Sequence, residues 1–185
     1  MGQASMATRG KQTSTKTDRA YAAGVLDADG SICISKAKPA TLLKAVESDK
    51  TRRFMNPRYV VYVNVVNTSE VLMHWLCERF GGRFAPRKMQ HPDRQRQTFD
   101  WRLQNNGCEP FLRLVAPYLQ IKKERAYTAL RFWDEAISYP KGRGARLPQS
   151  EVDRREALYC EMKGLNQVGV VQPQRLSPEA PPSGG

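Results

Sequence analysis

The stretch that decides the fold is AAGVLDADG, residues 22–30, which is followed directly by Ser31 and Ile32. The residues before Asp27 and Asp29 have the periodicity of a helix that begins at Asp18, and Asp is a residue type that caps helices. Four positions share one face of this helix and are nearly all small: Ala20, Ala23, Gly24 and Asp27. Small side chains let two helix backbones approach closely, so the pattern predicts tight packing against another helix.

The residues after Gly30 change to the alternating pattern of a strand, with Ile32 and Ile34 on one side. Further elements are predicted from the same patterns: a strand over 58–66, a helix over 70–80 that Thr68 or Ser69 caps and Gly81-Gly82 ends, strands over 83–89 and 97–104, and helices over 108–115, 122–139 and 149–166. We therefore predict an α+β fold of order αββαββα with extra C-terminal helices. In such a fold, helices cover one side of a four-stranded antiparallel sheet.

The spacing of apolar residues also predicts which side chains face the core. On the helix over 70–80 these are Val71, Leu72, Trp75 and Leu76. On the last strand Phe99, Trp101 and Leu103 point inward, and the residues between them point outward. The outward side of the sheet is therefore polar and basic.

At 185 residues the chain has room for one domain with a substantial core. Residues 1–17 are basic, contain no apolar segment of the secretory type and are expected to form a disordered arm. Residues 170–185 are rich in proline and glycine and are expected to form a disordered tail. The folded domain is thus predicted to span residues 18–169, and it contains no internal duplication.

A formal net charge of +12 predicts a polyanionic partner, with nucleic acid as the first candidate. No stretch is apolar for the length of a spanning helix, and no strongly basic amphipathic helix stands out, so we expect no membrane association. The four cysteines are scattered, with no close pair of the kind that builds a structural zinc site. Reduced thiols of this kind are typical of intracellular proteins.

The segment AAGVLDADG, with the strand after it, resembles the LAGLIDADG motif. The predicted order of elements is similar to that of the single-motif LAGLIDADG homing endonucleases over nearly the whole folded region. The resemblance implies a site-specific endonuclease that hydrolyses both strands of a long, pseudo-palindromic double-stranded DNA target and leaves 3′ overhangs. It also implies Mg²⁺ as cofactor, with Mn²⁺ or Ca²⁺ as substitutes for binding. The expected location is the cytoplasm of a prokaryote, or a chloroplast or mitochondrion.

The physical chemistry of the motif explains why one copy is not enough. Two small-faced helices packed side by side deliver one carboxylate each to a shared centre, where carboxylate and carbonyl oxygens hold Mg²⁺. Metal ions in that place contact both the attacking water and the leaving oxygen of an in-line phosphodiester hydrolysis. Because this chain has a single such helix, the second must come from another copy, which predicts a homodimer. Its interface is expected to include Ala20, Ala23, Gly24 and Asp27.

The resemblance assigns the chemistry at the end of this helix to particular residues. Asp29 is the metal ligand, and the backbone carbonyl of Ala28 is a further ligand. Asp27 is expected to cap or brace the partner helix. Two alternatives for the segment are a calcium loop and a plain helix-to-strand turn with solvated acids. Gly30 comes two positions too early for the former, and Lys38 stands where its closing Glu should be.

Two further catalytic residues carry over from the family pattern. Asn67 matches the position that orients the metal-bound water, although it also suits a helix cap. Lys122 matches the basic residue near the scissile phosphate, with Lys123 as a substitute, although both also suit a solvated helix start. Val71 stands where the family often has a second basic residue, and this departure alters the network that organises water.

For DNA recognition we expect the outward faces of the strands to enter the major groove, where Arg, Lys, Asn and Gln read base edges. The candidates on or beside the strands are Ser35, Arg58, Tyr62, Asn64, Arg87, Lys88, Arg102 and Gln104. Those placed for phosphate contacts are Lys36, Lys38, Arg94 and Arg96.

Other functions fit the same sequence. One is a LAGLIDADG-like regulator that binds DNA without cutting it, or an intron RNA maturase. Another is a basic RNA-binding protein of ribosomal type, which only the charge suggests. Retention of both acids favours the endonuclease, because a protein that only binds DNA would gain by losing negative charge beside phosphates.

Overall fold

The computed structural model describes residues 14–36, 57–89, 91, 93–138 and 147–167. In these ranges the elements are α1 (Lys16–Asp29), β1 (Gly30–Lys36), β2 (Tyr59–Asn67), α3 (Glu70–Phe80), β3 (Arg83–Pro86), β4 (Phe99–Gln104), α4 (Cys108–Val115), α5 (Lys123–Asp134) and α6 (Gln149–Leu165). The predicted α+β class and order of elements are confirmed. Most of the two predicted tails, residues 1–13 and 170–185, lies outside the described residues.

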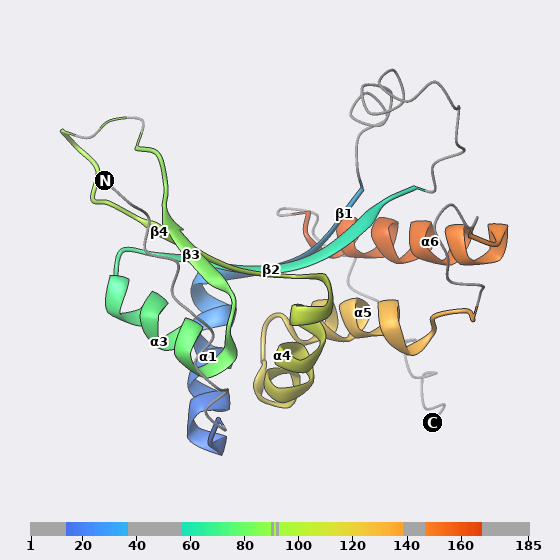
Figure 1. The fold of residues 1–185 in the computed structure, drawn as a ribbon, viewed down its shortest axis with the longest axis horizontal. Coiled ribbons are helices and arrows are strands. Elements are labelled where there is room, and N and C mark those ends of the chain that lie inside the picture. The colour runs from blue at the N-terminus through green and yellow to red at the C-terminus, as the bar shows by residue number, and fades with distance from the viewer. Residues whose placement is uncertain (1–13, 37–56, 90, 92, 139–146, 168–185) are drawn as a thin grey trace, which may run out of the picture.

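A curved, four-stranded antiparallel sheet with strand order β1-β2-β4-β3 forms the centre of the molecule. Helices α1, α3, α4 and α5 lie beneath its convex side, and the concave side carries no helix in the described part of the chain (Figure 1). Alternate strand residues such as Ile32, Val63 and Trp101 are fully buried against the helices, since neighbouring side chains of a strand point to opposite faces. The residues between them lie on the concave face.

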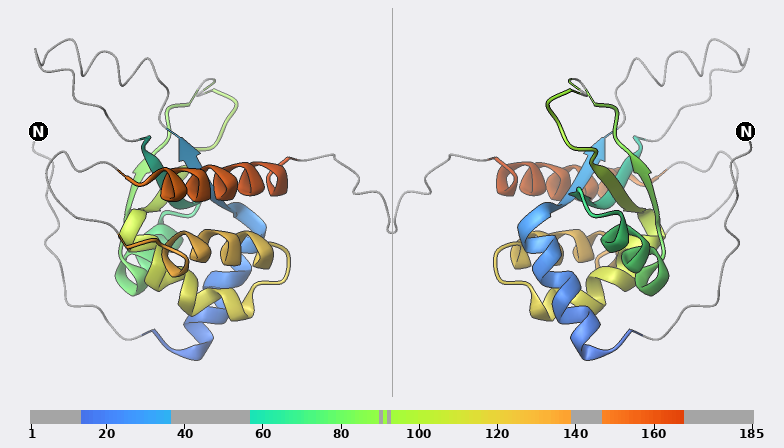
Figure 2. Two further views of the ribbon diagram at one scale, coloured as in Figure 1. Left: turned by 90° about the vertical axis from the view of Figure 1, so that its right-hand side faces the viewer. Right: turned by 90° about the vertical axis from the view of Figure 1, so that its left-hand side faces the viewer.

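Helix α1 begins earlier than the sequence analysis predicts. Thr15 is its N-cap, and a capping box joins it to Asp18: the Asp18 N–H donates to the Thr15 hydroxyl at 3.1 Å, and the Thr15 N–H donates to the Asp18 carboxylate at 2.8 Å. Asp18 is therefore the third helical residue rather than the cap, and the helix starts two residues before the predicted domain boundary. Figure 2 shows α1 rising from the bottom of the molecule into the sheet, where Asp29 passes directly into β1.

Helix α3 is capped by Ser69, whose hydroxyl accepts from the Leu72 N–H at 3.3 Å. Gly81 and Gly82 end it at φ values of 78° and 89°, which favour glycine. The prediction that Val71 faces the core is wrong, because its side chain is 80% exposed. Leu76 is buried as predicted, together with Met73 and Phe80, and these three side chains belong to the hydrophobic core.

The C-terminal helices follow the predicted order, but α5 ends at Asp134 rather than near residue 139. Helix α6 lies along α5 and beside β1, the edge strand of the sheet (Figure 2). Asn166 donates its side-chain amide to the Ile32 carbonyl at 3.0 Å, and Glu156 accepts from Lys36 at 2.7 Å. These bonds cover an edge that would otherwise expose unpaired backbone groups. Within the described residues, no helix combines the length and apolar character needed to cross a membrane.

Candidate active site and nucleic-acid interface

Asp29 is exposed at the last position of α1, where it meets Asn67, the residue predicted to orient metal-bound water. The Asn67 side-chain amide donates to Asp29 Oδ2 at 2.7 Å. The amide oxygen of Asn67 accepts from the Ser69 N–H at 2.8 Å, and Ser69 in turn caps α3. Asn67 therefore links Asp29 to the start of α3, and it holds one of the two carboxylate oxygens of Asp29 by a hydrogen bond.

Lys122 approaches the same helix end from the segment before α5. Its Nζ donates to the carbonyl of Leu26 at 2.9 Å and to that of Asp27 at 2.5 Å. Carbonyls in the last turn of a helix lack partners within the helix, and they attract a cation. Burial lowers the pKa of Lys122, and the charges of Asp27 and Asp29 partly offset this effect. Lys122 thus stands as a half-buried cation beside the acid, whereas Lys123 is exposed as the first residue of α5.

Asp27 is held within its own chain. Its carboxylate accepts three backbone N–H bonds, from Gln120 at 2.7 Å, Ile121 at 3.2 Å and Lys122 at 2.8 Å. Burial would raise the pKa of Asp27, but these bonds and the Lys122 charge outweigh it and hold the pKa below its ordinary value. Within its own chain, Asp27 therefore ties the end of α1 to the segment that carries Lys122. The expectation that Asp27 also caps or braces a partner helix stays a prediction.

The donors at this helix end fit a hard divalent cation. Asp29 supplies a carboxylate, and the Ala28 carbonyl has no hydrogen bond to another described residue, whereas the two preceding carbonyls bind Lys122. Mg²⁺ prefers such oxygen donors and keeps several waters of its own. In the described part of the chain no group of three His, Cys, Asp or Glu residues could hold a metal ion. At this helix end, a single chain thus offers a metal ion the carboxylate of Asp29 and the carbonyl of Ala28.

The outer face of α1 is small and open, although not at every predicted position. Ala20, Gly24 and Ala28 are exposed, and a Cβ atom added at Gly24 would meet nothing within 4 Å. Ala23 is fully buried in the core of its own chain, so it is not available to a partner. Tyr21, 54% exposed, extends this face and packs edge-on against Trp75 of α3. The open face therefore keeps the predicted positions Ala20 and Gly24, extends to Ala28 and leaves out Ala23.

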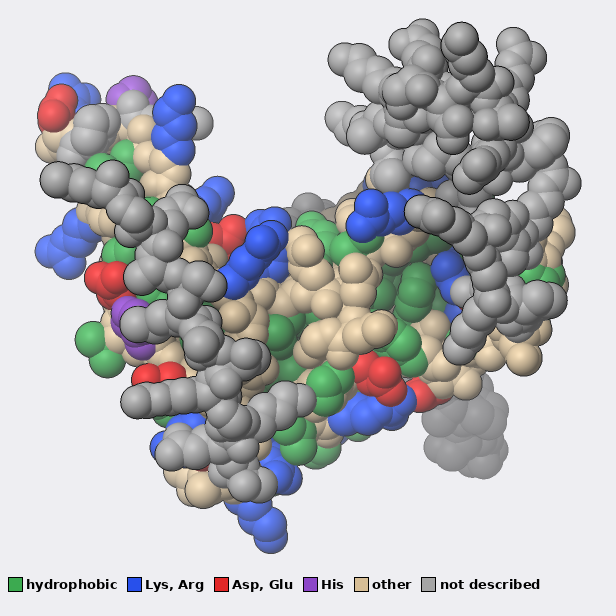
Figure 3. Space-filling view, viewed as in Figure 1, with side chains coloured by type: hydrophobic (Ala, Val, Ile, Leu, Met, Phe, Trp, Pro, Cys, Tyr) green, Lys and Arg blue, Asp and Glu red, His purple; other side chains and the backbone are tan. Residues whose placement is uncertain are grey.

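The concave face of the sheet carries a polar row that crosses all four strands. The paired positions are Ser31 with Asn64, Asn64 with Arg102, and Arg102 with Arg83. Cys33, Tyr62 and Gln104 form the next row. Figure 3 shows Lys and Arg side chains along this hollowed side of the molecule and on the β3–β4 connection. The sequence analysis missed Arg83, which the alternation of the third strand would have placed on the outward face.

The remaining predicted DNA contacts are placed as follows. Arg58, Arg87, Lys88, Arg94 and Arg96 are exposed beside the strands or in the β3–β4 connection. Ser35 lies on the concave face, where its hydroxyl donates to the Val60 carbonyl at 3.4 Å. Lys36 forms an ion pair with Glu156, so it is less available to phosphates than expected. Lys38 lies outside the described residues.

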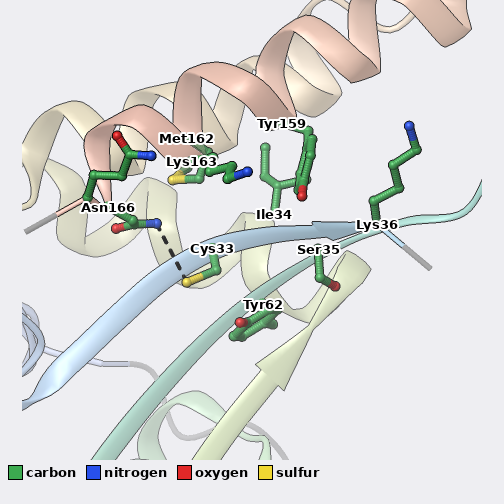
Figure 4. Close-up of a pocket in the computed structure, with 10 residues that line it drawn as sticks. Cys33, Ile34, Ser35, Lys36, Tyr62, Tyr159, Met162, Lys163 and Asn166 are labelled. Atoms are coloured by element: carbon green, nitrogen blue, oxygen red, sulfur yellow. Dashed lines mark hydrogen bonds between the residues drawn. The ribbon is translucent and has the colours of Figure 1, made fainter. Parts of the chain in front are cut away.

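A groove of about 380 Å³ runs between α6 and the outer side of β1. Figure 4 shows its lining, with Tyr159, Met162 and Lys163 from α6 above Ser35 and Cys33 of β1. Asn166 closes one end through its contact with the Cys33 sulfur at 3.6 Å. The groove opens beside the concave face, but it contains neither Asp29 nor Lys122, so it is separate from the acid end of α1.

Comparison with known proteins yields matches among solved structures only. No protein-family model matches the chain, and no curated protein does. The structure of the homing endonuclease I-CvuI in complex with its target has a TM-score of 0.56 and 18% identity, covering 81% of this chain and 82% of that chain. The archaeal intron-encoded homing endonuclease I-Vdi141I, complexed with DNA, has a TM-score of 0.58 and 16% identity, covering 83% and 86%. The chain has the fold of the LAGLIDADG homing endonucleases.

Proposed function

We propose that this protein is a site-specific, metal-dependent DNA endonuclease that acts as a homodimer. It cuts both strands of a long, pseudo-palindromic target and leaves 3′ overhangs. The observation that carries the proposal is the meeting of Asp29, Asn67 and Lys122 at one helix end. The three residues come from separate segments, and the fold is one that homing endonucleases share.

The chemistry of each residue follows from its position. A divalent cation, Mg²⁺ in the first instance, would be held by the Asp29 carboxylate and the Ala28 carbonyl and would supply Lewis acidity to the phosphodiester. Asn67 fixes the orientation of Asp29 through the 2.7 Å bond and offers a polar surface to the attacking water. Lys122, held 2.5–2.9 Å from the carbonyls of α1, places its positive charge where negative charge develops on the phosphate.

The proposal requires a second copy because one chain supplies one carboxylate. The exposed small residues Ala20, Gly24 and Ala28 let a second α1 pack closely enough to bring two Asp29 side chains together. Tyr21, on α1 itself, and Ile121, whose N–H donates to Asp27, are large apolar side chains that are 54% and 73% exposed. A two-fold dimer would read two similar half-sites, which gives the target its approximate palindrome.

Self-association can be tested with a matched pair of glycines. Gly24→Glu places a charge in the proposed interface, and Gly164→Glu places the same charge at an exposed position of α6, where a Cβ also meets nothing within 4 Å. Sedimentation should show a dimer for the wild type and for Gly164→Glu, and a monomer with unchanged circular dichroism for Gly24→Glu. A dimer that survives Gly24→Glu would place the interface elsewhere.

Cleavage can be tested with Asp29→Asn on a target selected from a randomised duplex library. We expect this variant to bind the target but not to cut it with Mg²⁺, because the amide keeps the shape of the carboxylate and loses its charge. Asp93→Asn, an exposed position in the β3–β4 connection, is the control and should cut normally. Substantial cleavage by Asp29→Asn would refute the assigned role.

A second candidate function is binding without scission, as in a DNA-binding regulator or an intron RNA maturase. The exposure of Val71 at the start of α3 favours it, because the family often has a basic residue at that position. A wild-type protein that binds duplex DNA and leaves it intact with Mg²⁺ and Mn²⁺ would support the regulator. Preferential binding of intron RNA would support the maturase. Any of these functions suits an intracellular compartment, the cytoplasm of a prokaryote or an organelle.

A further inference from the structure

Arg102 occupies a central place on the concave face of the sheet. It lies on β4, which has a neighbouring strand on each side, and it pairs across the sheet with Asn64 and Arg83. Its side chain is 40% exposed. A basic residue at the rim of a DNA-binding surface usually meets phosphates, whereas one in the middle of a surface that enters the groove faces base edges.

Two neighbours hold the Arg102 guanidinium in place. Its Nη2 donates to Asp100 Oδ2 at 2.8 Å, and its Cζ lies 5.7 Å from the ring centre of Tyr62, which comes from the adjacent strand β2. An Arg that is held by a carboxylate and laid over an aromatic ring loses less side-chain entropy when it binds, because its orientation is already restricted. The remaining N–H donors of the guanidinium keep their fork geometry.

Only one of the two carboxylate oxygens of Asp100 has a hydrogen-bond partner among the described residues. Its Oδ1 is buried and has no hydrogen-bond partner among the described residues, and a buried carboxylate oxygen without a partner lowers stability. It also adds negative charge to a face that must approach phosphates. Such a conflict between stability and local chemistry is typical of functional sites. Among the described residues, Asp100 Oδ2 bonds to Arg102, and this contact orients the guanidinium.

We infer that Arg102 reads a guanine in each half-site of the DNA target, and that Asp100 positions it for this contact. The inference rests on the proposed function and names a determinant of its specificity. A guanidinium that is fixed in orientation matches the O6 and N7 acceptors of guanine with two parallel hydrogen bonds. Asp100 does not read a base itself, because one of its oxygens is bound to Arg102 and the other is buried.

The test compares base preferences at every position of the target, selected for binding from a randomised duplex library. For the wild type we expect one position per half-site at which guanine is preferred by roughly 5- to 150-fold. Arg102→Lys keeps the charge but not the fork, and it should lose most of that preference at that position alone. Asp100→Asn should weaken the same preference while overall affinity for duplex DNA stays equal or rises.

Arg96→Ala is the matched control, since Arg96 is an exposed basic residue in the β3–β4 connection. It should lower affinity for all sequences alike and leave every base preference unchanged. Melting curves of each variant show whether the fold is kept, and Arg102→Gln provides a second substitution of similar length if Arg102→Lys unfolds.

The possible results separate this inference from the proposed function. If Arg102→Lys and Asp100→Asn both relax one guanine position, the inference is supported, whether or not the protein cuts DNA. If specific binding and cleavage remain and no position changes in either variant, the inference is overturned and the endonuclease stands. A position relaxed by Asp100→Asn but unchanged in Arg102→Lys would overturn it too, because Asp100 would then act on the base without Arg102.

Discussion

Replacement of Asp27 is the sharpest test of how the candidate active site is assembled. Asp27→Ala removes the acceptor of three backbone N–H bonds of 2.7, 2.8 and 3.2 Å. Gln120 and Ile121 are exposed, so water can replace part of what is lost, and we take ~1 kcal/mol for each bond. The free energy of unfolding should therefore fall by about 3 kcal/mol, which corresponds to a decrease in Tm of roughly 6–12 °C. Asp27→Asn keeps an acceptor oxygen and should lose about 1 kcal/mol.

The assay is urea unfolding followed by circular dichroism, with Asp93→Ala as the control for the loss of an exposed acid. Because the pKa of Asp27 is held below its ordinary value of 3.8, its contribution is complete above that pH and is lost as the pH falls through the lower folded-state pKa. The difference between the wild type and Asp27→Ala should then shrink in strong acid. A destabilisation below about 0.5 kcal/mol at neutral pH would refute the reasoning, because surface substitutions without specific contacts give changes of that size.

Three further predictions concern the helices and the DNA interface. Burial would raise the pKa of Glu151, but Arg154 and Arg155 outweigh this effect and lower the pKa from 4.5 to about 2. About 3 kcal/mol of stability is therefore present above pH 4.5 and should be lost as the pH falls through 2. The stability difference between the wild type and Glu151→Gln should close over that range. Gly30→Ala should destabilise the fold, since its Cβ would lie 2.4 Å from Leu26 Cδ1 and 2.9 Å from the Leu26 carbonyl oxygen; a melting temperature equal to that of the wild type would contradict this. The logarithm of the DNA affinity should fall steeply with the logarithm of salt concentration, and Arg96→Ala should reduce that slope by about 1 if it contacts a phosphate.

Much of the fold could be predicted because its signals are local. The alternation of Tyr59, Val61, Val63 and Val65 fixes which side of β2 is buried, and the two glycines after α3 mark its end. The capping box of α1 was missed, although Thr15-x-x-Asp18 has the required spacing. Val71 was misplaced for a physical reason: apolar residues cover more than one face of α3, and only packing against the sheet decides which face is buried.

The residues of the candidate site could be named from the family resemblance, and their roles stay predictions, whereas the hydrogen bonds that connect them could not be predicted. Asp29, Asn67 and Lys122 lie together as the family resemblance implied. The bonds of Asp27 to residues 93–95 positions away have no local signal, so sequence reasoning assigned Asp27 to a partner helix. Ala23 shows the same difficulty, because neighbouring small positions on a helix can serve either the core of the chain or a second copy.

The distance along the chain between Asp27 and its three donors has a consequence for the order in which the protein folds. Contacts that close a loop of some ninety residues form slowly, because the chain loses the entropy of the open loop before the contact can stabilise it. We expect the basic sheet to exist before Lys122 is locked beside the acid. Under the proposed function, a partly folded molecule would therefore bind nucleic acid before its cleavage centre is assembled.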